Sequence, residues 1–440
     1  MTDDPSNDCD LTGSGLPRMI PPIPCISGIE INGALSASPY TPIDPSTDTI
    51  RLFRLEGGLD DTIRGSLIRC SLSTASRYTA LSYEWGSPDN PKEICINGIA
   101  VQIRRNLWEA LNAITSINFR PPRPNIDDQV GTLWIDSICI DQSNTAEKNH
   151  QVQQMAAIYS TAASVISWLG PHTPQSTMLF EWGGQTSLLS GWKGTDAQTS
   201  VTTLGSAAKQ LLEREYWTRL WIIQEVLLAQ DHQLLCGRDC FSAYTFFDAW
   251  TQPGRSIIDK FSPPDAPCDK LDFVDVTSTP GYGVLLMKFA DFPESVGSFY
   301  SFYDLFDMFH DRKCVNPYDK IYGLVGIVTI RGFGTGIEVD YAKSPEQLCC
   351  DVITAVWEDL RRDPPNVPLR TSKFVDRLLR SLQLQVPNAC DSCDGARTDG
   401  KLMPVPERVA NHLGYLAKVR PSTFRGLAGY HPDWPAPSWN

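Results

Sequence analysis

The sequence predicts an α/β protein in which helices flank a parallel β-sheet, with added N-terminal strands and a mainly helical C-terminal extension. Three observations favour this fold class. Short apolar runs separated by turn residues fill residues 50–85 and are typical of strands. Residues 133–169 show the order strand, helix, strand, which predicts a βαβ unit with parallel pairing. From residue 286 onward, apolar residues recur at helical spacing.

The N-terminal part changes character near residue 48. Residues 1–47 are rich in Pro, Ser, Gly and Asp without lasting periodicity, so we expect a mostly flexible arm. Three strands are then predicted over the strings IRLFRL, SLIRCSL and TALSYEW. A β-hairpin follows in ICINGIAVQI, where Asn97-Gly98 lies between two apolar runs.

Helices and buried strands alternate over the next hundred residues. Asn106 with Glu109 predicts a capping box at a helix start. The apolar run TLWIDSICIDQ predicts a strand buried on both faces. Asn144 with Glu147 predicts the cap of a helix that leads into another buried strand, SVISWLG.

The second half is organised around a loop-rich boundary. A polar insertion is expected over residues 171–200, and a mostly apolar helix from about Glu213 to Gln230. We place the α/β domain at 48–250, a Pro-, Asp- and Ser-rich linker at 251–285 and the helical extension at 286–440. Within the extension, Ser344-Pro345-Glu346-Gln347 predicts a helix start.

Composition excludes several classes of protein. Lys and Arg total 38 and Asp and Glu total 51, and a formal net charge of −13 disfavours general nucleic-acid binding. The 13 cysteines are too sparse for a small disulfide scaffold, which favours free thiols in a reducing compartment. The acidic N-terminus does not resemble a signal peptide, and no apolar stretch reaches membrane-spanning length. We therefore expect a cytoplasmic protein without a membrane span.

Glu225 is the first candidate functional residue. Trp221 and Glu225 are four residues apart, so on a helix they would share a face. The flanking residues are apolar, and a buried carboxylate needs a partner or a pocket and has a raised pKa. One interpretation is a functional carboxylate. The other is a structural carboxylate paired with an arginine such as Arg219.

Acidic and polar residues near predicted strand ends are the second candidate. Ligands of parallel α/β sheets bind beyond the carboxyl ends of the strands. Asp136, Asp141 and the following Gln-Ser-Asn string lie there, as does the string SYEWG at residues 82–86. Capping and turn formation explain Asp136 and Asp141 equally well. No metal site is predicted, because Cys390 and Cys393 form a lone CxxC pair.

Three ordered strings resemble the fungal heterokaryon-incompatibility (HET) domain family. They are ALSYEWG at 80–86, LWIDSICIDQ at 133–142 with the helix and WLG string that follow, and YWTRLWIIQE at 216–225. The resemblance extends to RKCVNPYDKIYGLVG at 312–326 and covers about residues 40–360. Long family members continue past a Pro-Ser-Trp string like the one near Trp439, so the extension is expected to be truncated or diverged.

The resemblance implies a role in fungal non-self recognition and regulated cell death. HET domains are similar to TIR domains, which have a flavodoxin-like sheet and in some members cleave NAD. This similarity implies a catalytic Glu225, with Ser82, Trp85, Asp136 and Trp221 lining a nucleotide cleft. NAD would be the substrate, and no cofactor would be required.

Arginines would bind the phosphates of such a substrate. The nearest candidates in the sequence are Arg104, Arg105 and Arg219. The alternative implied by the same resemblance is a non-enzymatic signalling module. It would act through self-association into a homo-oligomer or through a protein partner in incompatibility signalling.

Overall fold

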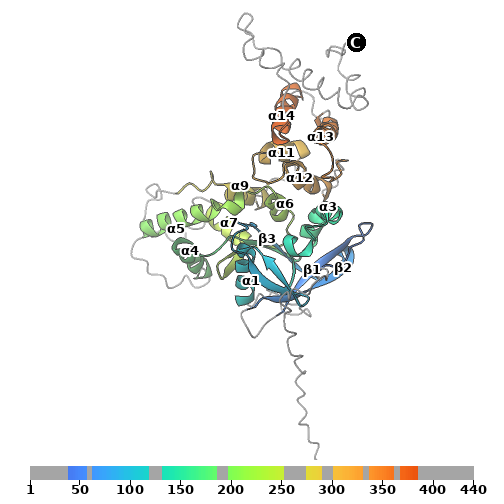
Figure 1. The fold of residues 1–440 in the computed structure, drawn as a ribbon. Coiled ribbons are helices and arrows are strands. Elements are labelled where there is room, and N and C mark those ends of the chain that lie inside the picture. The colour runs from blue at the N-terminus through green and yellow to red at the C-terminus, as the bar shows by residue number, and fades with distance from the viewer. Residues whose placement is uncertain are drawn as a thin grey trace, which may run out of the picture.

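A mixed nine-stranded sheet forms the centre of the part of the chain that the structure describes, with helices on both sides (Figure 1). The structure is a computed structural model that describes residues 38–56, 62–117, 131–185, 197–251, 274–289, 301–330, 336–360 and 367–384. The strands are β1 (Thr49–Glu56), β2 (Arg64–Ser71), β3 (Thr79–Tyr83), β4 (Lys92–Ile96), β5 (Ile99–Ile103), β6 (Thr132–Trp134), β7 (Ser164–Trp168), β8 (His232–Cys236) and β9 (Asp239–Ser242).

The parallel part of the sheet consists of β6, β3, β7 and β8, side by side in that order. Numbered along the chain, these strands have the spatial order 2-1-3-4, which is the order of flavodoxin-like doubly wound sheets. The predicted fold class is therefore confirmed. Such sheets bind ligands beyond the strand ends where the winding direction reverses, here between β3 and β7.

The added N-terminal strands extend the sheet beyond β6. Strand β1 pairs antiparallel with both β2 and β6, and β4 with β5 forms the predicted hairpin. Asn97 and Gly98 have φ angles of 53° and 79°, and two left-handed residues in a two-residue turn match the twist of the strands. The hairpin prediction is confirmed.

Helices cover the sheet, and a separate group packs against one side of it. The helices are α1 (Arg105–Ser116), α2 (Asp136–Cys139), α3 (Thr145–Thr161), α4 (Pro174–Gln185), α5 (Ala197–Leu212), η1 (Leu72–Thr74), η2 (Glu215–Thr218), α6 (Ile222–Leu227), α7 (Ala243–Thr251), α9 (Pro280–Phe289), α11 (Phe302–Phe309), α12 (Asp319–Ile330), α13 (Pro345–Leu360) and α14 (Val367–Ser381). Helices α11–α14 form the upper part of Figure 1, where α12 contacts α3 and α6. The mainly helical C-terminal region is thereby confirmed.

Two of the three helix starts predicted from capping residues are confirmed. Asn144 accepts a hydrogen bond from the backbone N–H of Glu147 at the start of α3, as predicted. Ser344 and Gln347 bond reciprocally at the start of α13, and this prediction is also confirmed. The cap predicted at Asn106 is wrong, because α1 already begins at Arg105.

Two longer predictions are also wrong. The string TLWIDSICIDQ forms a strand only as far as Trp134 and then turns into α2. The helix predicted over 213–230 is divided into η2 and α6. The chain is extended at Arg219, which forms an isolated bridge with Lys313. The backbone bonds of this bridge replace those that a continuous helix would make.

Ordered segments also lie within regions predicted to be loops. Helix α4 and part of α5 fall in the expected polar insertion, and α9 begins within the expected linker. Residues 38–47, the end of the predicted arm, lie against the sheet, where Pro42 accepts a bond from Arg69. Residues 1–37 lie outside the described residues.

Among the cysteines that the structure describes, one differs from the expectation of free thiols. Cys70, Cys139 and Cys349 are free, as expected. Cys95 is disulfide-bonded, so the expectation of a free thiol is wrong there.

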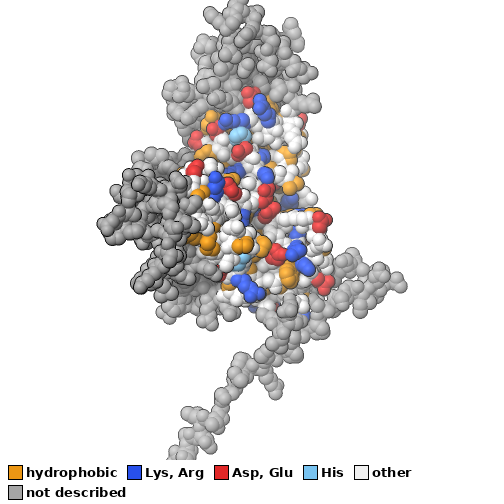
Figure 2. Space-filling view, turned by 90° about the vertical axis from the view of Figure 1, so that its left-hand side faces the viewer, with side chains coloured by type: hydrophobic (Ala, Val, Ile, Leu, Met, Phe, Trp, Pro, Cys, Tyr) orange, Lys and Arg blue, Asp and Glu red, His pale blue; other side chains and the backbone are white. Residues whose placement is uncertain are grey.

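Within the described ranges, no helix has the length and apolarity needed to cross a membrane. On the face shown in Figure 2, the acidic and basic side chains of the described residues are interspersed.

Helix α12 approaches α3 and α6 closely because Gly326 lacks a side chain. A Cβ atom at Gly326 would lie 2.7 Å from Cβ of Ala156, whereas a Cβ at Gly283 of α9 would meet nothing within 4 Å. We expect Gly326→Ala to lower the free energy of unfolding by about 1–3 kcal/mol through overpacking. The matched Gly283→Ala variant is expected to leave it unchanged or raise it. Equal losses in urea unfolding would contradict this account of the interface.

Candidate functional site

The candidate site lies where three parallel strands end. Ser82 is the fourth residue of β3, Asp136 follows β6 after one residue, and α6 brings Glu225 against β3 and β7. Because the carboxyl ends of parallel strands meet at one edge of the sheet, these three residues belong to one region. This region includes the reversal point between β3 and β7.

Glu225 is almost completely enclosed, with 4% of its surface exposed. Its carboxylate accepts a hydrogen bond from the hydroxyl of Ser82, which is 0% exposed. The pKa of Glu225 is raised to about 7, chiefly by burial and also by nearby Asp136, against the opposing effects of the Arg219 charge and the Ser82 hydrogen bond. A carboxyl with this pKa exchanges its proton near neutral pH.

Arg219 connects the two carboxyl groups electrostatically. Its guanidinium is half-buried, donates to the backbone carbonyl of Tyr83 and interacts with the charges of both Glu225 and Asp136. The predicted partnership of Glu225 and Arg219 is therefore present as a charge interaction. A cation between two acids lowers the cost of ionising either one in a buried setting.

Asp136 and Trp85 form the more exposed side of the cluster. The indole N–H of Trp85 donates to the Asp136 carboxylate at 2.7 Å, and the guanidinium of Arg104 lies 5.2 Å from the centre of the Trp85 ring. Burial raises the pKa of Asp136, against the effects of Trp85 and Arg219. Arg105 pairs instead with Glu109 on the surface. Two of the three predicted arginines thus lie at the cluster.

Three polar residues that sequence reasoning missed continue the cluster into the sheet. Tyr216 and Ser167 lie beyond Ser82, and His232 follows them, all of them buried. A signal was available, because ALSY and VISW each place a serine before an aromatic residue on strands predicted to be parallel. Ser82 and Ser167 are in fact register partners.

The indole of Trp221 bonds to the C-terminal region. Trp221 is the N-cap residue of α6 with helical backbone angles, and its carbonyl accepts the backbone N–H of Glu225. Its indole donates to Asp319 of α12 at 3.0 Å, and Asp319 also accepts from Tyr341 at 2.7 Å. The structure thus brings Ser82, Asp136 and Glu225 together, with Trp85 at the edge, and places Trp221 against the C-terminal helices.

Comparison with known proteins finds a family similarity in the part of the chain that carries this cluster. Residues 78–225 match the family model described as heterokaryon incompatibility protein (HET). This segment is similar to HET domains. The matched segment begins just before β3 and ends at Glu225, so it contains the strand ends and the residues clustered there.

A curated relative agrees with this assignment. The chain is 29% identical over 360 residues to "Heterokaryon incompatibility protein 6, OR allele" of Neurospora crassa. The match covers 68% of this chain and 50% of that protein, so the chain spans half the length of this relative. No solved structure matches the chain at a significant level.

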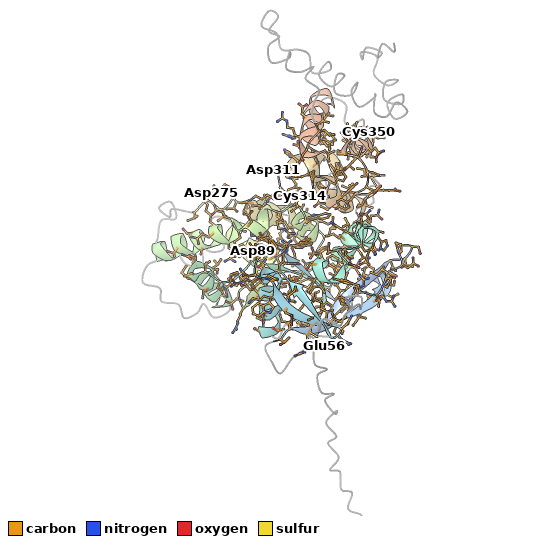
Figure 3. The ribbon with its side chains drawn as sticks, viewed as in Figure 1. Glu56, Asp89, Asp275, Asp311, Cys314 and Cys350 are labelled. Carbon is orange, nitrogen blue, oxygen red and sulfur yellow. The ribbon has the colours of Figure 1, made fainter. Side chains whose placement is uncertain are left out.

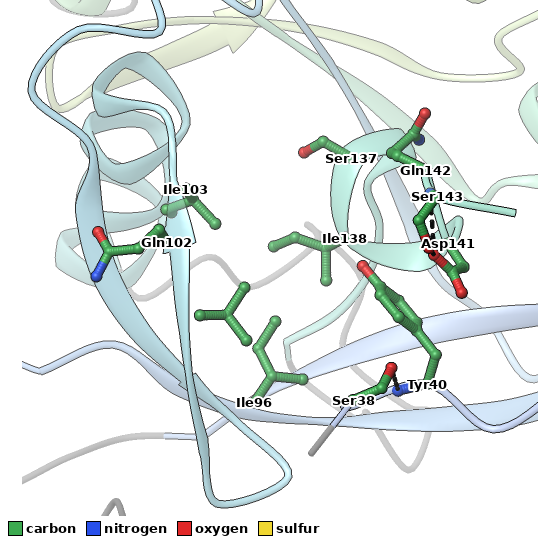
Figure 4. A pocket seen from close by; sticks show the side chains of 11 residues that line it. Ser38, Tyr40, Ile96, Gln102, Ile103, Ser137, Ile138, Asp141, Gln142 and Ser143 are labelled. Atoms are coloured by element: carbon green, nitrogen blue, oxygen red, sulfur yellow. Dashed lines mark hydrogen bonds between the residues drawn. The ribbon is translucent and has the colours of Figure 1, made fainter. Parts of the chain in front are cut away.

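A pocket of about 290 Å³ lies beside this cluster, between the β4–β5 hairpin and the loop after α2 (Figure 4). Asp141, Gln142 and Ser143, which were predicted to line a crevice, line this pocket together with Tyr40. Ser143 donates to the Asp141 carboxylate, as expected for a turn. Ser137 connects pocket and cluster, since it accepts a hydrogen bond from Tyr83.

The segment between α11 and α12 lies against residues 218–220, which include Arg219. Lys313 donates its backbone N–H to Thr218 and accepts from Leu220. Asp311 and Cys314, labelled in Figure 3, mark this segment between the C-terminal helices and the sheet. The backbone on both sides of Arg219 is therefore hydrogen-bonded to the C-terminal region. Among the residues that the structure describes, no group of His, Cys, Asp or Glu could hold a metal ion.

The raised pKa of Glu225 predicts how stability depends on pH. Between the ordinary value of 4.5 and about 7, folded Glu225 holds a proton that the unfolded chain has lost. The contribution of this group to stability therefore falls as pH rises through that window, by on the order of 3 kcal/mol, and is level above it. Urea unfolding at several pH values should show this loss relative to Glu225→Gln. Parallel pH profiles of the two proteins would contradict it.

Proposed function

We propose that this protein acts in heterokaryon incompatibility and that its HET domain cleaves NAD with Glu225 as the essential residue. The biological part is supported by the HET-family match and by the relative from Neurospora crassa. The enzymatic part is supported by one observation above all. A carboxyl with a pKa raised to about 7 lies at the reversal point of a flavodoxin-like sheet, beside Arg219.

The chemistry requires few groups. Cleavage breaks the bond between ribose C1′ and the nicotinamide nitrogen, whose bonding electrons return to the ring and neutralise it, so no general acid is needed. The ribosyl group develops oxocarbenium character, which a nearby carboxylate stabilises as in glycoside hydrolysis. Water then adds to C1′ and releases a proton, giving ADP-ribose and nicotinamide. Ionised Glu225 supplies the carboxylate.

Arginines near the cluster suit the diphosphate of the substrate. Arg104 and Arg219 flank Trp85 and Asp136 and are both half-buried. Guanidinium groups pair with phosphate oxygens through two parallel hydrogen bonds. Glu225 is 4% exposed, so substrate access requires the covering side chains to move. We expect assembly of the domain or partner binding to trigger this opening.

A non-enzymatic signalling role is the second candidate function. The observation that favours it is the enclosure of Glu225 by Ser82 and Arg219, which is also what a purely structural carboxylate needs. In that case the cluster fixes the position of α6, and the HET domain acts by binding a partner or another copy of itself.

Expression in fungal cells tests the proposed function. Cells that express the protein at high level should lose NAD and then viability, whereas cells that express Glu225→Gln should keep both. Glu109→Gln is the matched control, because this glutamate pairs with Arg105 on the surface. Death without a fall in NAD would support the signalling role, and death with Glu225→Gln at equal protein level would exclude Glu225.

A further inference from the structure

A continuous hydrogen-bonded chain joins Glu225 to His232 through three hydroxyl groups. Tyr216 Oη lies 2.6 Å from Ser82 Oγ and 2.6 Å from Ser167 Oγ. Ser167 Oγ lies 2.7 Å from His232 Nε2. Ser82 donates to Glu225 at the other end. All five side chains are buried, so water does not compete for these bonds.

The hydrogen bonds between Glu225 and His232 can run in only two self-consistent directions, because each hydroxyl has one proton to donate. If Glu225 is ionised, Ser82 donates to it, Tyr216 donates to Ser82, and Ser167 donates to Tyr216. His232 must then carry its proton on Nε2. If Glu225 is protonated and donates to Ser82, every bond reverses, and His232 accepts at Nε2 and carries its proton on Nδ1.

Nδ1 of His232 is the open end of this chain. It is buried and has no hydrogen-bond partner among the described residues. A proton that arrives at Nδ1 allows Nε2 to release its proton to Ser167. One proton then moves at each hydroxyl until Glu225 receives one. The hydrogen-bonded chain gains a single proton, Glu225 loses its negative charge, and no other group in the chain ends charged.

We propose that Ser82, Tyr216, Ser167 and His232 form a proton relay that carries protons to and from Glu225. They are positioning residues, since they act through Glu225. This inference goes beyond the proposed function, because the relay operates whether or not the domain cleaves NAD. In an NAD-cleaving domain it would gate activity by delivering or removing the proton of the essential carboxyl.

The surrounding charges are compatible with the relay. The charges of Arg219 and Asp136 shift the pKa of Glu225 in opposite directions. The charge of Glu225 in turn raises the pKa values of Tyr159 and of Tyr216 in the relay.

Burial and a neighbouring charge keep His232 neutral at the other end of the relay. Lys288 of α9 faces His232, and Asp231 in turn acts on Lys288. Burial and the charge of Lys288 lower the pKa of His232 to about 3. His232 therefore stays neutral near neutral pH, and only its tautomer can report the direction of the chain.

Imidazole nitrogen chemical shifts, measured by NMR on the whole polypeptide, test the relay. The His232 signals are assigned by their loss in His232→Gln. Between about pH 5 and pH 9, His232 should change from the Nδ1–H to the Nε2–H tautomer, with its midpoint at the pKa of Glu225. Tyr216→Phe removes one hydroxyl from the chain and should abolish the change. Ser167→Ala serves the same purpose if Tyr216→Phe does not fold.

Tyr78→Phe is the matched control, because the Tyr78 hydroxyl is buried but donates to the backbone of Ile158. It should leave the tautomer change intact. A His232 tautomer that stays constant in the wild type, or that changes equally in Tyr216→Phe, would overturn the relay. Neither result depends on NAD cleavage, so failure of the relay and failure of the proposed function can be told apart.

Discussion

Replacing Arg51 by alanine is expected to destabilise the protein by about 3–5 kcal/mol, which is the usual cost of leaving a buried charge without its partner. Arg51 is 1% exposed and forms two bonds to the Glu147 carboxylate, at 2.5 and 2.9 Å. It also donates to backbone carbonyls of Thr41 and Cys139. This single guanidinium therefore joins β1 to α2, α3 and the N-terminal segment.

Two control variants separate charge burial from simple loss of contacts. Arg105→Ala removes an ion pair of similar type from the surface and should cost less than about 1 kcal/mol. Combining Arg51→Met with Glu147→Met removes both buried charges and should recover most of the stability lost in Arg51→Ala. Urea unfolding measures all three variants. If Arg51→Ala costs no more than Arg105→Ala, the pair has no special role in the fold.

The largest functional effect is expected for Glu225→Gln. Glutamine has nearly the shape of glutamate but cannot carry the negative charge that would stabilise an oxocarbenium-like transition state. Loss of one preorganised electrostatic contact typically costs a factor of about 100–1000 in rate, and loss of a full charge at the reacting centre costs at least that. We expect NAD cleavage by this variant to fall by this factor or more. The amide oxygen of the substituted side chain can still accept the hydrogen bond from Ser82, so the fold is retained.

Much of the fold follows from local sequence patterns. The hairpin at Asn97-Gly98 and the caps at Asn144 and Ser344 depend on a few adjacent residues, and the structure confirms each of them. The βαβ order predicted the parallel sheet for the same reason. Local preferences and tertiary packing agree at these places, so the sequence alone is sufficient to predict them.

The incorrect predictions fall where distant residues decide the local structure. Asn106 does not cap α1, because its amide group is used between strands: it donates to Glu84 after β3 and accepts from Trp168 of β7. The helix predicted through Arg219 is interrupted by pairing with Lys313, nearly a hundred positions away in the sequence. Neither partner can be inferred from helical periodicity.

The candidate site shows the same division. Spacing alone singled out Glu225 and Asp136, because a carboxylate among apolar residues needs a local explanation. It also grouped Trp221 with Glu225, but the indole bonds to Asp319 of α12. Tyr216, Ser167 and His232 become visible as parts of one chain only when β3, β7 and β8 lie side by side.

Nicotinamide release from NAD by purified, concentrated protein tests the central claim most directly. The wild type and the surface control Glu109→Gln should release nicotinamide and ADP-ribose in equal amounts, most rapidly once the protein assembles. Glu225→Gln, shown to be folded by its unfolding curve, should release about 100-fold less or none. No release by the wild type in any assembly state, or undiminished release by Glu225→Gln, would contradict the assignment of Glu225 as the essential residue of an NAD-cleaving HET domain.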